Sequence, residues 1–492
     1  EVLAMWQKRL DAANVRRRLP ELYEYELDMK SKVGPMSIQL PLKERIASIE
    51  AYFADVTLKS EPINPQAIES VKKWISRAGG IRIRSLRRTV TQMRLSTNSG
   101  NPWFTKRKLV VEQVLRSRVY QVEGVWLMDI STASGVRTFH LCSVLGWRGQ
   151  EGGIKEEDVK QRVIWMMSMA LNAQELQFYQ PAIEAVQKNS LIPAYVSMDA
   201  VDQEVTRLFD SKRSTDVVVC TDFSRFDQHF NRDMQECAFE VEQSMLNPGV
   251  DRTHHQEIFR AKFELPIICS EDLMYDGPHG MGSGSGGTNF DECISHKALQ
   301  FEAAIEAKQP LNPHSMAYGD DGILSYRGIN VEDVIGTYTR HGQEMNPDKQ
   351  YVSTHDCVVL RRWHGMDYRV NGIMVGVYST FRALGRLLAQ ERYYDPEKWS
   401  KEMVTLRALS ILENCKWSPY FTEFIDFCET GDKYRLGRDL PGFFENLQKT
   451  ARKATEEFED FLGYTKNLQQ NPRDAAAGIM DWSVVKYLMS KK

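Results

Sequence analysis

The sequence lacks any hydrophobic run of the length that a membrane-spanning helix needs, about 18 or more apolar residues. Its longest apolar stretches, Val163 to Leu171 and Val217 to Cys220, are far shorter. We therefore expect no contact with a membrane. We also expect no secretion signal, because no basic segment followed by an apolar one opens the sequence. A Walker A motif is missing too, which argues against a P-loop ATPase.

Cysteine is sparse and shows no paired spacing. The eight cysteines are scattered, and no two of them lie within four positions of each other. This spacing excludes zinc knuckles and thioredoxin-like motifs and argues against a disulfide framework, so we expect free thiols in a reducing compartment. His229, His254 and His255 lack the spacing of zinc ligands, and we interpret them as structural residues.

Net charge is also close to absent, since 63 basic and 66 acidic residues give −3. This balance by itself indicates no partner. The 492 residues, 42% hydrophobic and 26% charged, correspond to roughly three domains of about 150 residues. The composition excludes wholesale disorder, collagen-like repeats and a coiled coil.

One stretch departs from the overall balance of charge. Between Lys72 and Arg118 the sequence has thirteen basic residues, three interleaved aromatic residues and a single acid, Glu112. A stretch of one sign with aromatics predicts a surface that neutralises phosphates and stacks bases. The alternative is a solvated basic face without a ligand. The run includes Arg82, Arg84, Arg87, Arg88, Arg94, Lys106, Arg107 and Lys108.

The pattern along the chain indicates an α+β protein without a linker that isolates a domain. Residues 1–75 are mostly helical in pattern, 80–150 are mixed, and 155–210 have helical periodicity. Residues 216–378 combine short β-rich runs with helices. From residue 381 onward the pattern is helical, with breaks at proline and glycine. A mixed centre with a helical C-terminal region is typical of an α+β enzyme.

Three carboxylates are expected to meet in the centre of the chain. A β-branched run that starts at Asp216 predicts a buried strand with Asp222 at its exit. Further on, two short apolar runs flank Gly-Asp-Asp-Gly at 319–322, which predicts a hairpin with Asp320 and Asp321 at its tip. Adjacent carboxylates repel each other unless they share a cation. Together with Asp222 they form an all-oxygen set that suits Mg²⁺, for which Mn²⁺ could substitute. Two such ions are the usual catalysts of phosphoryl displacement.

A glycine-rich loop lies between these two segments. Residues 279–289 contain five glycines and lead into an amphipathic stretch whose apolar residues predict a helix with one buried face. Thr288 and Asp291 form a candidate capping box. We expect a mobile backbone whose N–H groups approach phosphate or sugar. The alternative is a flexible linker, and a partial match to the dinucleotide fingerprint is weak because no strand pattern precedes it.

In order and spacing, these and four further motifs resemble the palm and fingers motifs of viral RNA-dependent RNA polymerases, above all those of picobirnaviruses and the related partitiviruses. The matching residues are Thr97, Ser99, Gly100 and Pro102 in T-x-S-G-x-P, Lys155, Lys160 and Arg162 in the basic finger motif, Asp222 and Asp227 in D-x₄-D, Ser283, Gly284 and Thr288 in S-G-x₃-T, Gly319, Asp320 and Asp321 in G-D-D, Lys349 in the lysine motif, and Arg361 and Arg362 in the primer-grip hairpin.

The resemblance implies a right-hand polymerase fold, with an antiparallel palm sheet flanked by helices. Residues 1–75 would link fingers and thumb, 76–210 would form the fingers, and 211–378 the palm, with a fingers insertion around 240–275. Residues 379–492 would form the thumb and a C-terminal helical region. The implied partners are template and nascent RNA, NTPs and a capsid protein, inside the virion and in the host cytoplasm, during replication and transcription of a double-stranded RNA genome.

The resemblance also implies roles for single residues. Asp222 and Asp320 would hold two metal ions with Asp321 beside them, and Lys349 would protonate the leaving pyrophosphate. Lys160 and Arg162 would steady the triphosphate. The residues implied in RNA contact are Thr97, Ser99, Gly100, Pro102, Lys155, Gly284, Arg361 and Arg362. For Lys349 a solvated lysine, and for the two arginines a surface pair, are the alternatives.

One position departs from the motif pattern. Many relatives place an asparagine four residues after the motif threonine, where it helps to read the ribose 2′-OH. This sequence has Glu292 there, and Asn289 directly follows Thr288. We expect Asn289 or Ser283 to share the sugar contact with Asp227. The polar side chain of Asp227 argues against a reverse transcriptase, which would have an aromatic side chain at this position to exclude the 2′-OH.

Three other functions stay open from the sequence. The first is a reverse transcriptase or DNA-directed polymerase, which would prefer dNTPs. The second is an inactive palm-like RNA-binding scaffold, although a scaffold has no need for three mutually repelling carboxylates. The third is a two-metal nuclease, which would leave the glycine loop and the basic finger motif unexplained.

Overall fold

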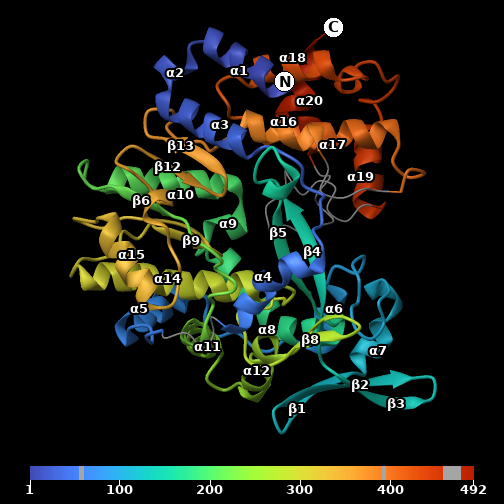
Figure 1. The fold of residues 1–492 in the computed structure, drawn as a ribbon. Coiled ribbons are helices and arrows are strands. Elements are labelled where there is room, and N and C mark those ends of the chain that lie inside the picture. The colour runs from blue at the N-terminus through green and yellow to red at the C-terminus, as the bar shows by residue number, and fades with distance from the viewer. Residues whose placement is uncertain (55–59, 390–394, 458–477, 492) are drawn as a thin grey trace.

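The computed structural model describes residues 1–54, 60–389, 395–457 and 478–491 of the chain. The chain has four small sheets, of which β1-β2-β3 (residues 118–140) projects from the body of the molecule, and both ends of the chain lie at the opposite end (Figure 1). The α+β class predicted from the sequence is confirmed. Among the residues that the structure describes, none of the helices combines the length and the apolar character that crossing a membrane requires.

The described part of the first 75 residues is largely helical, as its pattern predicts. The last of these helices starts where the side chain of Asn64 accepts a hydrogen bond from the backbone N–H of Gln66 and Pro65 occupies the first turn, both common at helix N-termini. The helices of this region are α1 (Val2–Ala12), α2 (Val15–Arg18), α3 (Pro20–Lys32), α4 (Leu42–Ala54) and α5 (Pro65–Ile75).

The segment from 76 to 211 corrects one expectation. Residues 160–166 form a strand, not the start of a helix, because they pair with β4 along their length and Val163 and Trp165 alternate with more exposed neighbours. The long helix begins only at Met169. The elements here are η2 (Ser76–Ala78), α6 (Leu86–Thr91), η3 (Arg107–Leu109), α7 (Val111–Leu115), β1 (Arg118–Val122), β2 (Val125–Thr132), β3 (Gly135–His140), β4 (Ser143–Gln150), η4 (Glu156–Asp158), β5 (Lys160–Met166), α8 (Met169–Lys188), α9 (Pro193–Val196) and α10 (Met198–Ser211).

Strands from the middle of the sequence form a four-stranded antiparallel sheet with the order β11-β6-β10-β9. All four residues of β6 are buried, because the strand has neighbours on both edges and helices over the sheet. The predicted buried strand and the predicted hairpin are both present in this sheet. Its strands are β6 (Val218–Thr221), β9 (Met316–Tyr318), β10 (Asp321–Leu324) and β11 (Tyr351–Ser353).

The other elements between 212 and 378 lie outside this sheet. The strands β7 and β8 join β4 and β5 in a separate sheet with the order β5-β4-β7-β8. The elements are α11 (Arg232–Met245), α12 (Thr253–Ile258), α13 (Ala261–Glu264), β7 (Ile267–Ser270), β8 (Leu273–Tyr275), α14 (Thr288–Glu306), α15 (Val331–Arg340), η5 (Pro347–Lys349), β12 (Asp356–Val359), β13 (Arg362–Gly365) and β14 (Val377–Tyr378).

The helix after the glycine loop differs from its prediction in two ways. Residues 290–300 of α14 are buried on every side, not on one face, because α5, α11, α15 and β9 all pack around the helix. The predicted capping box is wrong as well. Gly287 is the N-cap, and Asp291 forms an ion pair with the buried Lys262 instead of closing on the first turn.

The C-terminal region is helical in its described residues, as predicted, and packs on the N-terminal helices. Trp6 of α1 donates a hydrogen bond to Thr380 Oγ1 at 2.8 Å, and the apolar faces of α1 to α3 share one core with α16 to α20. The elements are α16 (Thr380–Leu388), α17 (Lys401–Glu413), α18 (Phe421–Gly431), η6 (Arg435–Gly437), α19 (Leu447–Glu457), η8 (Ile479–Asp481) and α20 (Ser483–Ser490).

Candidate active site

The ends of β6 and β10 bring the predicted carboxylates together. Thr221 lies opposite Gly322 in the antiparallel register, so Asp222, just past the end of β6, is next to Asp321 at the start of β10. The turn before β10 needs a glycine, because Gly319 has a φ of +59°. Local pairing of two strands therefore creates a cluster of acids.

The charges of this cluster oppose one another. Burial and the neighbouring Asp320 raise the pKa of Asp321 to about 7. Burial, followed by the charge of Asp227, raises the pKa of Asp320. The pKa of Asp222 is also raised by burial. Elevation of several neighbouring carboxyl pKa values is the behaviour expected where a cation normally neutralises the charge.

The donor chemistry fits a hard divalent cation, because every candidate ligand is a carboxylate oxygen. Within the described part of the chain, however, no three His, Cys, Asp or Glu side chains already stand together as a metal site. One oxygen of Asp321 accepts a hydrogen bond from the backbone N–H of Leu360 at 2.7 Å. This contact holds Asp321 toward the β12–β13 turn and leaves it one free oxygen for a shared ion.

Positive side chains surround the acids from several segments. Lys160 and Arg162 lie two residues apart on β5. The charge of Lys160 lowers the pKa of Asp222, and the charge of Arg162 lowers the pKa of Asp320. Lys349, exposed at the end of η5, also lowers the pKa of Asp222. The structure thus brings the basic finger motif and the lysine motif to the carboxylates.

The other predicted basic residues divide between exposed and buried positions. Arg361 is exposed in the β12–β13 turn and lowers the pKa of Asp321, whereas Arg362 is buried in β13. Only Arg361 of the pair therefore faces the acids. Lys155 is exposed at the start of η4, where its backbone N–H donates to Asp158 at 3.1 Å.

Two residues near the acids were missed from the sequence. Gln350 receives a hydrogen bond from the backbone N–H of Asp222 at 2.7 Å and donates to the carbonyls of Asp222 and Asn346. It thereby joins the end of β6 to the turn that presents Lys349. Lys32, at the end of α3, lowers the pKa of Asp222 as well. Neither residue belongs to a motif, so no sequence signal could have indicated them.

The glycine loop is packed tightly against the protein, which contradicts the expectation of a mobile backbone. A Cβ on Gly284 would lie 1.7 Å from the carbonyl oxygen of Trp165, and one on Gly287 would lie 2.0 Å from the ring of Tyr179. Thr288 Oγ1 donates to loop carbonyls, the nearest at 3.3 Å. Glycine is needed here for close approach, and the flexible-linker alternative does not hold.

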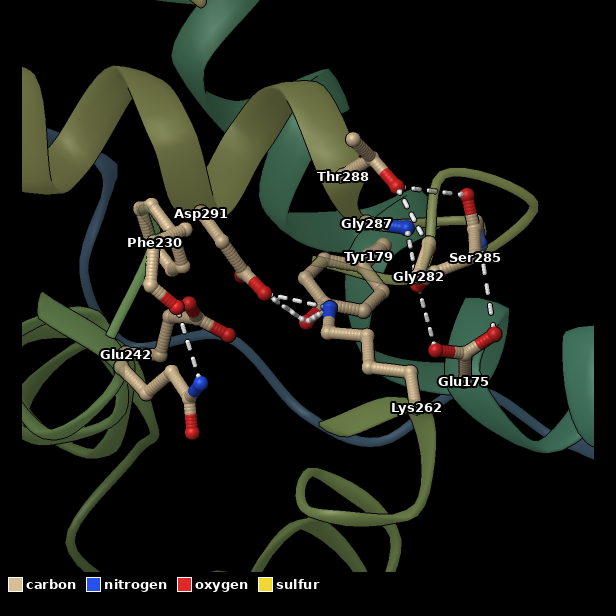
Figure 2. Close-up of polar contacts among 12 residues, drawn as sticks. Glu175, Tyr179, Phe230, Glu242, Lys262, Gly282, Ser285, Gly287, Thr288 and Asp291 are labelled. Carbon is tan, nitrogen blue, oxygen red and sulfur yellow. Dashed lines mark hydrogen bonds and ion pairs between the residues drawn. The ribbon is translucent and has the colours of Figure 1, made fainter. Parts of the chain in front are cut away.

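Two buried acids hold the loop and the helix after it (Figure 2). Glu175 of α8 accepts hydrogen bonds from Ser285 Oγ at 2.5 Å and from the backbone N–H of Gly286 at 3.2 Å. Asp291 of α14 accepts from Tyr179 and pairs with Lys262, and the side chains of both Asp291 and Lys262 are inaccessible to solvent. The sequence around Lys262 gave no sign of this role, because only the fold places Lys262 under the loop.

The histidines that we interpret as structural are in structural positions. His255 is buried against Glu242, with 3.1 Å between Nε2 and Oε1, and burial lowers the pKa of His255 to about 3. Burial raises the pKa of Glu242 to about 7. His229 Nδ1 and His254 Nε2 lie 3.1 and 2.9 Å from backbone carbonyls.

Asn289 and Ser283, which we expect to share the ribose contact with Asp227, each have a hydrogen-bond partner within the protein. Asn289 accepts a hydrogen bond from the hydroxyl of Tyr195 at 2.8 Å, and Ser283 Oγ accepts one from the backbone N–H of Trp165 at 3.2 Å. Glu292 is the acid that faces Asp227. Burial and the charge of Asp227 raise the pKa of Glu292 well above its usual value, and burial also raises the pKa of Asp227.

Known proteins similar to this chain share its whole length. Residues 147–367 match a family model described as viral RNA-dependent RNA polymerase. A human picobirnavirus protein named "Potential RNA-dependent RNA polymerase" is 49% identical over 490 residues, which cover 99% of this chain and 91% of that protein. The chain belongs to the viral RNA-dependent RNA polymerases.

Two crystal structures are similar to this polymerase over its full length. The RNA-dependent RNA polymerase of a human picobirnavirus has a TM-score of 0.92 and 49% identity, and its insertion loop deletion mutant has 0.91 and 46%. Each match covers 100% of this chain and 91% of the other. The predicted family and right-hand polymerase fold are confirmed, and the polymerase function is favoured over the reverse transcriptase, scaffold and nuclease alternatives.

The T-x-S-G-x-P element of the polymerase is folded inward. Ser99 is fully buried, and its backbone carbonyl accepts a hydrogen bond from the N–H of Met169 at 2.8 Å. A Cβ on Gly100 would lie 2.5 Å from the carbonyl of Met167. Thr97 Oγ1 donates to the Arg94 carbonyl at 3.3 Å. Pro102 is partly exposed, so it and its neighbours form the outer surface of this element.

The basic stretch of the polymerase is only partly available to RNA. Arg84 is buried and donates to Glu184, Gln92 and Gln180, and Arg107 donates to Asn172 at 3.0 Å. These two arginines stabilise the fold around α8. The exposed members of the stretch are Lys73, Arg77, Arg82, Arg87, Arg88, Lys106, Lys108, Arg116 and Arg118.

The close packing of the glycine loop predicts unequal effects of two similar substitutions. Gly284→Ala places a Cβ against the rigid backbone of β5, so the loop must move by more than 1 Å. Gly286→Ala meets only the flexible Leu176 side chain, with Cγ and Cδ2 at 2.9 Å. We expect Gly284→Ala to slow RNA synthesis about a hundredfold and Gly286→Ala to retain most activity, measured by primer extension. Equal rates for the two variants would show that the loop is free to shift.

Proposed function

We propose that this protein copies an RNA template by adding NTPs to the 3′ end of RNA, with Asp222, Asp320 and Asp321 as its metal-binding acids. The observation that supports this most directly is the pairing of β6 with β10, which places the G-D-D turn beside the end of the strand that carries Asp222. When bound, two Mg²⁺ ions would neutralise the triphosphate and lower the pKa of the attacking 3′-OH.

The basic residues around the acids have separate tasks in this proposal. Lys160 and Arg162, on one face of β5, bind the triphosphate of the incoming nucleotide through charged hydrogen bonds. Lys349 donates a proton to the leaving pyrophosphate, and Gln350 holds the turn of Lys349 against Asp222. Their approach to the acids from different elements supports these roles.

The ribose pocket is assigned to Asp227 and Glu292. Because burial and the charge of Asp227 raise the pKa of Glu292, we assign Glu292 a protonated carboxyl, which can donate a hydrogen bond to a 2′-OH as an amide would. Asn289 accepts a hydrogen bond from Tyr195, and Ser283 accepts one from the backbone of β5. In this proposal both residues stabilise the pocket and do not contact the ribose.

Contacts with RNA are assigned to surfaces beside the acids. Arg361 contacts the primer from the β12–β13 turn, and Arg362 stabilises that hairpin from within. Gly284 and Thr288 shape the loop beneath the template. The residues assigned to the outer template path are Thr97, Ser99, Gly100, Pro102 and Lys155, the first four as a folded element whose surface, more than its buried side chains, meets RNA.

The wider organisation follows the family. We assign 76–210 to the fingers, 211–378 to the palm and 379–492 to the thumb, with 1–75 bridging fingers and thumb. The shared core of α1 to α3 with α16 to α20 supports this bridge. We also assign to this polymerase replication and transcription of a double-stranded RNA genome, inside the virion and in the host cytoplasm next to a capsid protein, and the similarity to a picobirnavirus protein supports this assignment.

The catalytic assignment predicts the effect of Asp320→Asn. The change keeps the size of the side chain but removes a negative ligand, so synthesis of poly(U) on poly(A) should fall by at least about a hundredfold while RNA binding is unchanged. Asp276→Asn, at the exposed residue that directly follows β8, is the control. Labelled UTP incorporation, with and without EDTA and with dTTP in parallel, measures the effect. Retained synthesis by Asp320→Asn would contradict the assignment.

The raised pKa of Asp321 predicts that metal affinity depends on pH. Below about pH 7 this carboxyl holds a proton that a metal ion must displace. The affinity for Mn²⁺ should therefore rise as pH increases from 6 to 7, by up to about tenfold for one proton, and level off above. Titration calorimetry without RNA or NTP measures it, and Asp321→Asn should remove the dependence. The same affinity at pH 6 and pH 8 would refute the expectation.

The protonated state of Glu292 predicts which substitution is tolerated. Glu292→Gln keeps a neutral donor, so the preference for UTP over dUTP should stay within about twofold of the parent. Glu292→Leu removes the hydrogen bond and should reduce that preference about tenfold, the effect of roughly 1.4 kcal/mol. Competition between the two nucleotides in primer extension measures both. A leucine variant with full discrimination would exclude Glu292 from the ribose pocket.

A further inference from the structure

The N-terminal helix α3 is anchored beside the active site at the β12–β13 turn. The hydroxyl of Tyr25 donates a hydrogen bond to the carbonyl oxygen of Arg361 at 2.7 Å, and Leu22 and Tyr25 are buried against the side chain of Trp363. The residue whose carbonyl is held in this way is the exposed arginine that faces the acids. The position of α3 is therefore tied to one wall of the site.

The segment after α3, residues 33–40, is anchored on the opposite wall, and we name it the strap. Gln161 of β5 donates to the carbonyl of Ile38 at 2.9 Å, and its Oε1 accepts from the N–H of Leu40 at 3.2 Å. A Cβ on Gly34 would lie 1.5 Å from the carbonyl of Gly153. Figure 1 shows the strap descending from α3 beside β4 and β5 to α4.

Lys32 lies where α3 meets the strap, between these two anchors. Gln161, which binds the strap, stands between Lys160 and Arg162 on β5, so the nucleotide-facing strand and the end of α3 are held together. The side chain of Lys32 is half exposed, and its ion pair with Asp28, at 3.3 Å, joins two exposed groups. Such a pair contributes little in water and leaves the ammonium available.

Four cations from four distant segments converge at this place. Lys32, Arg361 and Lys349 lower the pKa of Lys160, in addition to the larger effect of its burial, and Asp222 opposes them. Like charges held close together raise the energy of the folded protein unless an anion lies among them. Asp222 is the carboxylate that acts on Lys160, and the phosphates of a nucleotide would add negative charge among the four cations. The arrangement therefore suits a ligand with several negative charges.

We propose that Lys32 is a phosphate-binding residue of the polymerase, which contacts the triphosphate of the incoming nucleotide or the pyrophosphate that leaves it. The proposal rests on the function above and adds the N-terminal region to the nucleotide site. Lys32 forms and breaks no covalent bond in it. The strap and Tyr25 hold the ammonium between β5 and the β12–β13 turn, so that it adds a charged hydrogen bond to those of Lys160 and Arg162.

The test is Lys32→Ala in the full chain, with Lys30→Ala as the matched loss of a lysine on the same helix. Lys30 contacts Gln7, on the side of α3 that meets α1. We expect Lys32→Ala to raise KM for UTP about fivefold to tenfold with kcat within twofold, Lys32→Arg to restore most of the affinity, and Lys30→Ala to change neither constant. Thermal unfolding of all three variants should match the parent.

Two readouts separate the triphosphate from the pyrophosphate. If only the KM for UTP rises, Lys32 binds the triphosphate of the substrate. If only the KM for pyrophosphate in the reverse reaction rises, Lys32 binds the product. Unchanged values in both would overturn the proposal. If the parent protein made no RNA, the proposed function would fail instead, and calorimetry with pyrophosphate alone would still decide whether Lys32→Ala weakens binding.

Discussion

The pairing of β6 with β10 is the constraint on which the rest of this molecule depends. It places carboxylates from two strands side by side, where they raise one another's pKa and destabilise the folded protein unless positive charge is nearby. β6 can tolerate this because it is buried along its whole length between two neighbouring strands. The stable core of the sheet thus compensates for the repulsion between the acids at the ends of its two inner strands.

The positive charge that balances these acids comes from elements far apart in sequence. Lys160 and Arg162 are held by the pairing of β5 with β4, Lys349 by Gln350, and Arg361 by a turn whose carbonyl binds α3. Each cation is therefore positioned by a separate contact. The N-terminal helices pack on the C-terminal ones, and α3 reaches the site at the β12–β13 turn. The site therefore depends on segments from both ends of the chain as well as on the sheet that carries the acids.

Close packing has a comparable role around the glycine loop. The loop has no space for side chains next to β5 and Tyr179, and buried groups hold it from below: Glu175 at the loop itself and the pair of Asp291 with Lys262 at the following helix. Burying charge is costly, and these groups are stable because each carboxylate accepts several hydrogen bonds. A rigid loop beside the proposed ribose pocket suits discrimination between nucleotides better than a mobile one.

The sequence by itself determined the acids, the basic motifs, the hairpin and the family, because these depend on residue types at short, regular spacings. It failed where distant residues decide the outcome. Residues 160–166, for which the pattern predicts a helix, form β5 because they pair with β4. Packing on all sides buries residues 290–300 of α14, for which the pattern predicts a single buried face. Only the tertiary structure placed Glu292 against Asp227 and Lys32 beside Lys160, since pKa values and charge clusters arise from neighbours that no local pattern reveals.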